Sequence, residues 1–592
     1  MARNTFRIDE ELDAPFQWGQ LGRAVRYMGK YAKNIATVFV ITVASTLLGL
    51  LVPLLTQRAI DVYIPAKDIE SLLALGGVML LIIAFCAFCA RWRYRLNNRT
   101  GQGIIRDIRS DLYAHLQKLP FEYYDSRPAG KIFVRVVNYV NAVADFLSSG
   151  LVNAILELLS MVFMVFYMLY ISPPLTLVIL SGLPLFVAYI FITKPRQRRA
   201  FRLFNNKSSN MTAYLSENIN GVRVTQSFTR EEYNLGIFAS LQKDTRDNYM
   251  KAVRITHSIW PVSALTSWLV VAAMYIVAAA GIRSGDGHMT VGTVIAMAGF
   301  AWRFWWPVQN LGNIYNSLIT AASYLERIFQ VMDEPVTVSD VPNAYELPAI
   351  NGIVTFLNVD FSYEPGVPVL KNVTFEVNQG DSIALVGPTG AGKSTVINLL
   401  SRFYNKDSGG IYIDGHDINE VTLASLRRQL GVMLQDTFIF SGDIMENIRY
   451  GRLDASDEEC IEAAKAVRAD EFIRRLPQGY LTAVHERGDG LSAGQRQLLS
   501  FARTLLSRPR VLILDEATSS IDTQTEKLVQ DGIAALMKGR TSFIVAHRLS
   551  TIRSCTRILY ISDGEIAESG SHDELIAKRG LYWHLYMSQL QA

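Results

Sequence analysis

The sequence predicts a protein of two parts, an α-helical domain embedded in a membrane and a C-terminal α/β domain. Three observations lead to this prediction. Half of the 592 residues are hydrophobic and only 19% are charged, which is a high apolar share for a large soluble protein. The long uncharged stretches lie almost entirely before residue 325. After about residue 351, short apolar runs of strand length alternate with helical segments, an order typical of α/β domains.

The overall composition excludes two other classes of protein. Lys and Arg total 58, Asp and Glu total 54, and the formal net charge is +4. We therefore expect no nucleic-acid partner, because such proteins usually show a concentrated basic excess. The 4 cysteines are too few for a disulfide scaffold. Cys86 and Cys89 form a C-x-x-C inside an apolar stretch, where we interpret them as packing residues.

Six apolar stretches are long enough to cross a bilayer, whose hydrocarbon core needs about 20 residues of helix. The longest uncharged run, 158–193, is interrupted by Pro173-Pro174, which predicts a turn between two helices. Buried helices of a soluble core would explain one such stretch but not six. The predicted spans are 35–57, 71–90, 146–171, 175–193, 258–282 and 289–315.

Lysine and arginine determine the predicted orientation. Residues 91–142 and 194–254 hold about ten and about twelve of them, and the other connections are short and poor in both. Both basic segments and both termini are therefore predicted to be cytoplasmic. We expect no signal peptide, because the N-terminus mixes acids and bases and lacks a short apolar core.

The predicted cytoplasmic segments are expected to form an interfacial helix and two long helical extensions with tips. Apolar residues from Trp18 to Met28 recur at helical spacing and predict an interfacial helix on the inner leaflet, or else a solvated helix. The two basic segments are expected to run out and back as helices that reach about 37 Å from the membrane. Their tips are placed at 119–125 and 217–228. Such extensions suit mechanical coupling to a cytosolic domain.

A polar, proline-containing stretch separates the two parts of the chain. It follows Met332-Asp333-Glu334-Pro335 and contains Pro342 and Pro348. We expect an N-terminal segment over 1–34, a transmembrane domain over 35–330, a linker over 331–350 and an α/β domain over 351–592.

The strongest chemical signal is a glycine-rich loop between the apolar strand 382–386 and a helix that continues through 396–400. Glycines let backbone N–H groups turn toward a phosphate, and the helix N-terminus adds positive potential. The lysine can reach the β- and γ-phosphates, and the serine hydroxyl can bind Mg²⁺. This predicted phosphate loop is Gly387-Pro388-Thr389-Gly390-Ala391-Gly392-Lys393-Ser394-Thr395.

A second apolar strand, 511–514, ends in two adjacent acids, Asp515 and Glu516. Asp515 is suited to Mg²⁺, directly or through water, and Glu516 to polarising an attacking water. Adjacent acids at a strand end are common and usually inert, but the phosphate loop upstream favours the catalytic interpretation.

With these motifs in place, the whole chain resembles a half-transporter of the ATP-binding cassette (ABC) exporter type. Leu491-Ser492-Ala493-Gly494-Gln495 is similar to the family signature Leu-Ser-Gly-Gly-Gln. The resemblance implies ATP and Mg²⁺ as cofactors and Gln435 as a residue that senses the metal and the γ-phosphate. It also implies roles for Tyr363 in stacking on adenine, His547 in bonding the γ-phosphate, and Asp522 in the loop that crosses a dimer interface.

The resemblance further implies a dimer, because each ATP of this family lies between the phosphate loop of one chain and the signature of another. Ser492, Gly494 and Gln495 would then act on a nucleotide held by a partner chain. Two residues differ from the family pattern. His485 stands where the family usually has glycine. Ala493 adds a methyl group where glycine lets the backbone approach the γ-phosphate closely. An altered signature beside an intact Glu516 favours a heterodimer, with a homodimer as the alternative.

The implied function is ATP-driven export of an amphipathic or hydrophobic drug, lipid or peptide across the cell membrane by alternating access. An importer on the same fold and a non-transporting regulatory or channel protein remain as alternatives. Glu157 and Arg303 are ionisable residues inside predicted spans and are therefore functional candidates. They could lie at similar depth and pair, either within the chain or across the dimer. Trp302, Trp305 and Trp306 would line a cavity with Arg303, or else form an interfacial belt.

Overall fold

The computed structural model describes residues 18–591, apart from 128, 285–288, 434–436, 486–487, 516–522 and 547–548. Contacts divide the chain into two compact units. The first comprises Met1–Gln117 and Ala129–Asp333, and the second comprises Lys118–Pro128 and Glu334–Ala592. The short segment Lys118–Pro128 thus groups with the C-terminal half.

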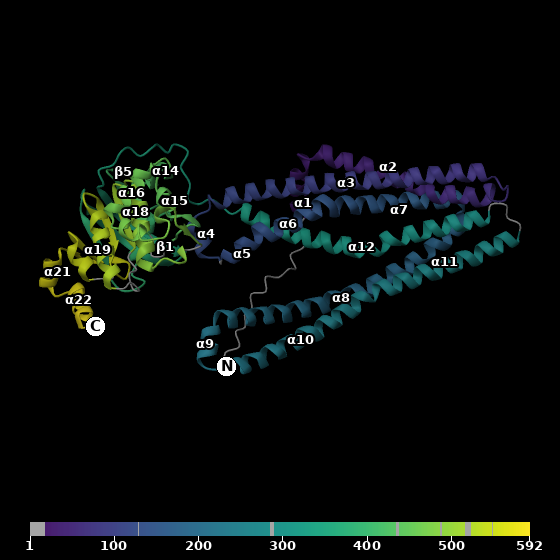
Figure 1. The fold of residues 1–592 in the computed structure, drawn as a ribbon. Helices are drawn as coiled ribbons and strands as arrows, with labels where there is room; N and C mark the ends of the chain where they lie inside the picture. Colours follow the sequence, from purple (N-terminus) through teal and green to yellow (C-terminus); the bar gives the residue numbers. More distant parts are fainter. Residues whose placement is uncertain are drawn as a thin grey trace. The chain divides into compact units, whose positions relative to one another are not determined.

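The first unit is a bundle of long helices (Figure 1). Helix α8 lies along α10 and α11, and α2 lies along α3 and α12. Its helices are α1 (Trp18–Gly29), α2 (Ala32–Arg58), η1 (Ala59–Tyr63), α3 (Ile69–Leu116), α5 (Ala129–Val134), η2 (Arg135–Tyr139), α6 (Val140–Asp145), η3 (Phe146–Gly150), α7 (Leu151–Ile171), α8 (Pro173–Asn220), α9 (Val222–Ser227), α10 (Glu231–His257), α11 (Ile259–Arg283) and α12 (Val291–Met332).

Five helical stretches among the described residues are long and apolar enough to cross a membrane. They run over Ala32–Tyr63, Ile69–Leu116, Ile132–Ile171, Pro173–Asn220 and Glu231–Arg283, and so contain the first five predicted spans. The sixth predicted span, 289–315, lies in α12, a helix of 42 residues that is also long enough to cross.

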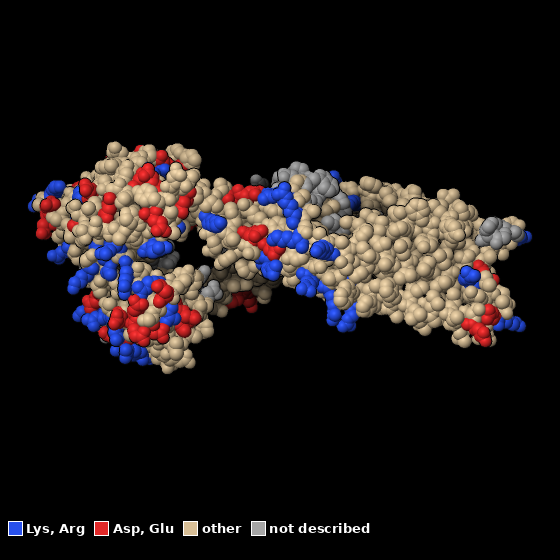
Figure 2. All heavy atoms as spheres, turned by 90° about the horizontal axis from the view of Figure 1, so that it is seen from above, with Lys and Arg blue, Asp and Glu red and all other residues tan. Residues whose placement is uncertain are grey.

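The surface of this bundle confirms that it faces lipid. Leu81 on α3 and Phe191 on α8 are 72% and 74% exposed, and many other large apolar side chains are exposed on the same helices. Figure 2 shows a wide area of these helices without charged residues. A soluble protein rarely exposes so large an apolar area.

The predicted turns and extensions are present. Pro173 begins α8 at a position where its missing N–H is not needed, and Ser172 before it is extended. Helices α3 and α8 each have 48 residues, or about 72 Å, more than twice the thickness of a bilayer core. The predicted tips hold the short helices α4 (Phe121–Asp125) and α9.

The second unit is built on three sheets. A six-stranded, mainly parallel sheet has the order β12-β11-β3-β10-β9-β6, a four-stranded antiparallel sheet has the order β2-β1-β4-β5, and β7 pairs with β8. The strands are β1 (Val354–Glu364), β2 (Val367–Val377), β3 (Ser382–Val386), β4 (Ser408–Ile413), β5 (His416–Asp417), β6 (Leu430–Met433), β7 (Gly442–Asp443), β8 (Ala483–Val484), β9 (Val511–Asp515), β10 (Thr541–Val545), β11 (Arg557–Ser562) and β12 (Glu565–Gly570).

The central strands β3 and β10 are buried at every residue. Alternate residues of β3 enter two different cores: Ala384 and Val386 face one cluster, whereas Ile383 and Leu385 face the other. Burial on both faces explains why these strands are continuous apolar runs in the sequence. The helices of this unit are α13 (Lys393–Leu400), α14 (Leu423–Gln429), α15 (Ile444–Arg449), α16 (Asp457–Ala466), α17 (Asp470–Ile473), η4 (Gly479–Leu481), α18 (Ala493–Leu506), α19 (Thr523–Met537), α20 (Leu549–Ser554), α21 (His572–Lys578) and α22 (Leu581–Gln591).

Candidate functional site

The glycine-rich loop joins β3 to α13, as its sequence context predicts. Gly387 has a φ of +146°, and a Cβ there would lie 2.1 Å from the carbonyl oxygen of Ile561. Gly392 has a φ of +104°, and a Cβ there would lie 2.6 Å from Leu370 Cδ2. Both positions therefore need glycine, and the loop is held close to strands β2 and β11.

Lys393, the first residue of α13, is only 7% exposed. Its Nζ donates hydrogen bonds to the carbonyl oxygens of Gly387 (2.9 Å) and Pro388 (2.8 Å). Burial lowers the pKa of Lys393, and the negative charge of Asp515 partly opposes this shift. The ammonium group thus lies inside the loop, within the electrostatic reach of the acid at the end of β9.

The strand order explains why these groups meet. Strands β3, β10, β9 and β6 are parallel neighbours, so their carboxyl ends lie at one edge of the sheet, where α/β proteins bind ligands. The loop follows β3 and Asp515 ends β9. Gln435, Glu516, Asp522 and His547 lie outside the described residues, but the chain reaches three of them directly after the carboxyl ends of β6, β9 and β10.

Tyr363, near the end of β1, lies beside this loop. Its hydroxyl is 3.2 Å from Thr395 Oγ1 and accepts a hydrogen bond from Asn398 Nδ2 at 3.3 Å. The Tyr363 ring packs edge-on against the Tyr404 ring, with centroids 5.0 Å apart. Tyr363 is nevertheless 40% exposed. The structure therefore brings a partly open aromatic ring next to the phosphate loop.

Tyr404 makes a further contact, with helix α4, that the sequence analysis did not predict. The Tyr404 hydroxyl donates a 2.5 Å hydrogen bond to Asp125 Oδ2, and the rings of Phe121 and Phe403 lie 4.3 Å apart. Burial and the Asp125 carboxylate raise the pKa of Tyr404. The only sequence signal was the aromatic pair Phe403-Tyr404 shortly after α13.

The signature segment starts helix α18. Ser492 is its N-cap: Ser492 Oγ accepts from the backbone N–H of Gln495 (3.2 Å), and Gln495 Oε1 accepts from the backbone N–H of Ser492 (2.9 Å). This is a capping box, which satisfies the free N–H groups at a helix start. Gly494 is buried, whereas Ala493 is half-buried and Ser492 is exposed.

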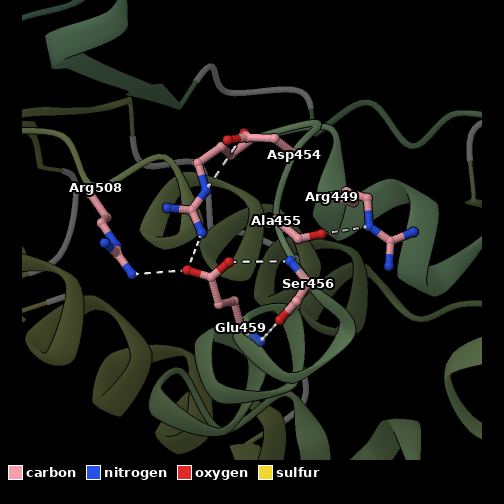
Figure 3. A network of polar contacts seen from close by, with 7 residues as sticks. Arg449, Asp454, Ala455, Ser456, Glu459 and Arg508 are labelled. Atoms are coloured by element: carbon pink, nitrogen blue, oxygen red, sulfur yellow. Dashed lines mark hydrogen bonds and ion pairs between the residues drawn. The ribbon is translucent and has the colours of Figure 1, made fainter.

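An ionic network holds the neighbouring helix α16, which packs against α18 (Figure 3). Glu459 Oε1 pairs with Arg452 and, at 3.1 Å, with Arg508 just beyond α18. Glu459 Oε2 accepts from the N–H of Ser456 at 3.1 Å, which completes a second capping box. The hydrogen bond from Arg452, with the one from the Ser456 backbone, lowers the pKa of Glu459. The start of α16 is thereby linked to the end of the signature helix.

Within the chain, the described residues do not pair Glu157 with Arg303, one of the two arrangements left open above. Arg303 Nη1 instead donates to the carbonyl oxygen of Gly49 on α2, at 2.6 Å. Glu157 lines a cavity at the level of Asn310 on α12, about 10 Å farther along that helix than Arg303. The two charges therefore lie at different depths.

The three tryptophans also do not converge on one cavity within the chain. Trp305 is buried and packs edge-on against Phe186, with centroids 6.0 Å apart. Trp302 and Trp306 are exposed, and Trp302 contacts Trp268. Cys86 and Cys89 are free thiols on α3, Cys89 buried and Cys86 partly buried.

Comparison with known proteins gives matches over both units. The model for the ABC transporter transmembrane region matches residues 35–308, and the model described as ABC transporter matches residues 370–519. The chain is 40% identical to the uncharacterized ABC transporter ATP-binding protein YknV of Bacillus subtilis, over 100% of this chain and 98% of that protein.

Two further relatives and one solved structure carry more specific names. The chain is 36% identical to the putative multidrug export ATP-binding/permease protein YgaD of Bacillus subtilis, covering 96% of this chain and 99% of that protein. It is 34% identical to a fatty acid ABC transporter ATP-binding/permease protein of Mycobacterium bovis, covering 96% of each. A bacterial Atm1-family ABC exporter with ATP bound superposes with a TM-score of 0.77 at 30% identity, over 95% of this chain and 98% of that one.

Proposed function

Because the chain belongs to the ABC transporters, with a transmembrane region fused to one ATP-binding domain, we propose that it exports an amphipathic or hydrophobic substrate as one half of a dimer. It is a multi-pass protein of the cell membrane with its ATPase domain in the cytoplasm, and it couples ATP hydrolysis to transport. The observation that carries the proposal is the phosphate loop around Lys393, built at the edge of a sheet in a chain that matches exporters over its full length.

Relatives named for multidrug export and fatty acid transport favour an apolar or amphipathic substrate. Export rather than import is supported by the relative named for multidrug export and by the structural neighbour, which is an exporter. The proposed domain limits remain 35–330, 331–350 and 351–592.

In the proposed site, Lys393 and the loop N–H groups bind the β- and γ-phosphates, and Tyr363 stacks on adenine. Ser394, Asp515 and Gln435 offer only oxygen ligands, the donor set that Mg²⁺ prefers. When bound, Mg²⁺ would neutralise charge on the phosphates. The exposed Ser394 side chain follows Lys393 directly, and the charge of Asp515 acts on Lys393, so these residues fit the ion. Glu516 would accept a proton from the attacking water, and His547 would bond the γ-phosphate.

ABC exporters of this type work as dimers, and we propose that this dimer is a heterodimer. The intact Glu516 and the altered signature at Ala493 support the proposal, since the partner would then supply an unaltered signature. Ser492, Gly494 and Gln495 would act on the partner's nucleotide, and Asp522 would lie where the two ATP-binding domains meet.

The test is ATP hydrolysis by the full-length chain in lipid nanodiscs. Glu516→Gln should abolish most of the turnover, because the isosteric amide cannot accept a proton from water. The matched control is Glu420→Gln, at an exposed acid of the same unit, which should leave turnover unchanged. Hydrolysis that is insensitive to Glu516→Gln would contradict the proposed site.

Direction is tested separately in inside-out vesicles. ATP-dependent accumulation of an amphipathic dye inside them supports export. ATP-dependent loss of preloaded dye would instead indicate an importer. Hydrolysis without movement of any dye, lipid or peptide tested would favour a regulatory or channel protein.

A further inference from the structure

Helices α7 and α12 enclose a cavity of about 180 Å³ within the membrane unit. Phe146 of η3 contributes to its wall, and Glu157 of α7 faces into it. Glu157 lies about 21 Å along the helix axis from the outer end of α7 at Ile171. The carboxylate is therefore well inside the predicted span, where ionisable groups are costly and usually functional.

One carboxylate oxygen of Glu157 has no protein partner. Its Oε2 is buried and accepts no hydrogen bond in the part of the chain that the structure describes. Among the described residues that line the cavity there is no lysine or arginine, and Arg303 is bound to Gly49 instead. Leaving a charged carboxylate buried in this way costs several kcal/mol unless a cation or a proton neutralises it.

The other polar lining groups suit a cation with N–H donors. Asn153, Asn310 and Ser317 all line the cavity, and each offers an acceptor oxygen. An ammonium group has three donors and no acceptor, so it complements one carboxylate with neighbouring amide and hydroxyl oxygens.

The remaining walls suit a carbon skeleton rather than a bare metal ion. Phe146 and Ile314 line the same space. Among the described residues, no group of three or more His, Cys, Asp or Glu side chains could hold a metal ion. Apolar walls with a few placed polar or charged groups are typical of sites for small organic molecules.

We propose that this cavity binds the ammonium head of a primary alkylamine, with Glu157 as its counter-ion and with Asn153, Asn310 and Ser317 as hydrogen-bond acceptors. The alkyl part lies against Phe146 and Ile314. This inference rests on the proposed export function, of which it names the substrate class. All of the named residues come from one chain.

The test is equilibrium binding of radiolabelled octylammonium to the full-length chain in lipid nanodiscs, with empty nanodiscs subtracted. Octanoate and 1-octanol, which carry a similar tail, are the matched probes. We expect saturable binding of octylammonium alone. Glu157→Gln keeps the shape but removes the charge, and it should weaken binding about ten-fold to a hundred-fold, as expected for a charge-assisted hydrogen bond.

Glu326→Gln is the matched control, because Glu326 lies on α12 but does not line the cavity; it should bind like the unmodified chain. If Glu157→Gln fails to fold, Asn153→Ala tests the same site and should weaken binding several-fold. Equal binding of the three probes, or an unchanged affinity in Glu157→Gln, would overturn the proposal.

ATP turnover in the same particles separates this inference from the proposed function. Glu516-dependent hydrolysis together with indifference to octylammonium means that only the cation site is wrong. Absence of Glu516-dependent hydrolysis even when the chain carries Ala493→Gly, which restores the signature, means that the proposed function itself fails.

Discussion

The surroundings of the Lys393 side chain suit the binding of a phosphate group. Its ammonium group is buried and is held by two loop carbonyls. Those bonds to neutral oxygens can be exchanged for stronger, charge-assisted bonds to phosphate. Burial lowers its pKa, but the neighbouring Asp515 favours the charged form.

We expect Lys393→Ala to weaken ATP binding by at least about ten-fold, because one charge-assisted hydrogen bond contributes about 1.5–3 kcal/mol. Binding of a fluorescent ATP analogue to the full-length chain measures this. Lys371→Ala, at an exposed lysine of β2, should bind the analogue normally. An equal effect of the two substitutions would mean that Lys393 has no particular role.

At Tyr363, the ring and the hydroxyl make separable contributions. The ring is partly exposed beside the loop, whereas the hydroxyl contacts Thr395 and Asn398. Tyr363→Ala should reduce ATP affinity about five-fold to a hundred-fold, the usual range for loss of base stacking. Tyr363→Phe should keep most of the affinity. The same binding measurement decides, and similar losses in both variants would show that the hydroxyl rather than the stacking matters.

At the scale of elements, the contact between α4 and the ATP-binding unit is the main finding that the sequence did not predict. Tyr404 touches Tyr363 on one side and bonds Asp125 of α4 on the other. Helix α4 lies between α3 and α5 in the chain. Tyr404 therefore joins α4 to Tyr363 within the second unit.

Tyr404→Phe removes only the hydroxyl that bonds Asp125. We expect it to leave basal ATP turnover within about two-fold, to lower stability by about 1 kcal/mol, and to abolish stimulation of turnover by transported compounds. Its raised pKa means that the phenol stays protonated, and the bond intact, at every pH below about 10. ATP turnover with and without substrate is the measurement, and Tyr412→Phe in β4 is the control. Normal stimulation in Tyr404→Phe would exclude this route of coupling.

Strands with two buried faces could be predicted well. The ranges 382–386 and 511–514 match β3 and the buried part of β9, because continuous apolar runs leave little ambiguity. Strand β2 was not predicted, because its residues are alternately buried and exposed and its pairing with β1 is irregular. The phosphate loop could be predicted because its residues are adjacent in sequence.

Contacts between distant residues could not be predicted from local patterns. Tyr404 and Asp125 are 279 residues apart, and nothing in either segment indicates the other. Glu157 and Arg303 do not pair within the chain for a related reason. Counting residues from helix ends gave similar depths, but packing of α7 against α12 places Glu157 near Asn310. Side-chain partners depend on this packing rather than on helix length.

At the scale of the whole molecule, the chain supplies one phosphate loop and one signature, so two chains are needed for two complete sites. Ser492 and Gln495 already cap their own helix, which presents Ser492 to the surface. Ala493 fits the first turn of α18, where an added methyl group costs nothing in helix stability. Any penalty from Ala493 must therefore arise against a nucleotide held by the partner chain.

Mixed dimers can measure that penalty directly. A dimer in which both chains carry Ala493→Gly has two unaltered signatures and two Glu516 residues. A dimer of the unmodified chain with a chain carrying both Ala493→Gly and Glu516→Gln has one complete site.

If Ala493 slows hydrolysis, turnover should be low for the unmodified pair and highest for the double-glycine pair, because glycine removes the added methyl group at each signature. The mixed pair should reach about half of that maximum. Two affinity tags isolate the mixed dimer in nanodiscs, and phosphate release gives the rates. Equal turnover in the unmodified and double-glycine pairs would show that Ala493 is harmless, and a homodimer with two equivalent sites would then be the better description.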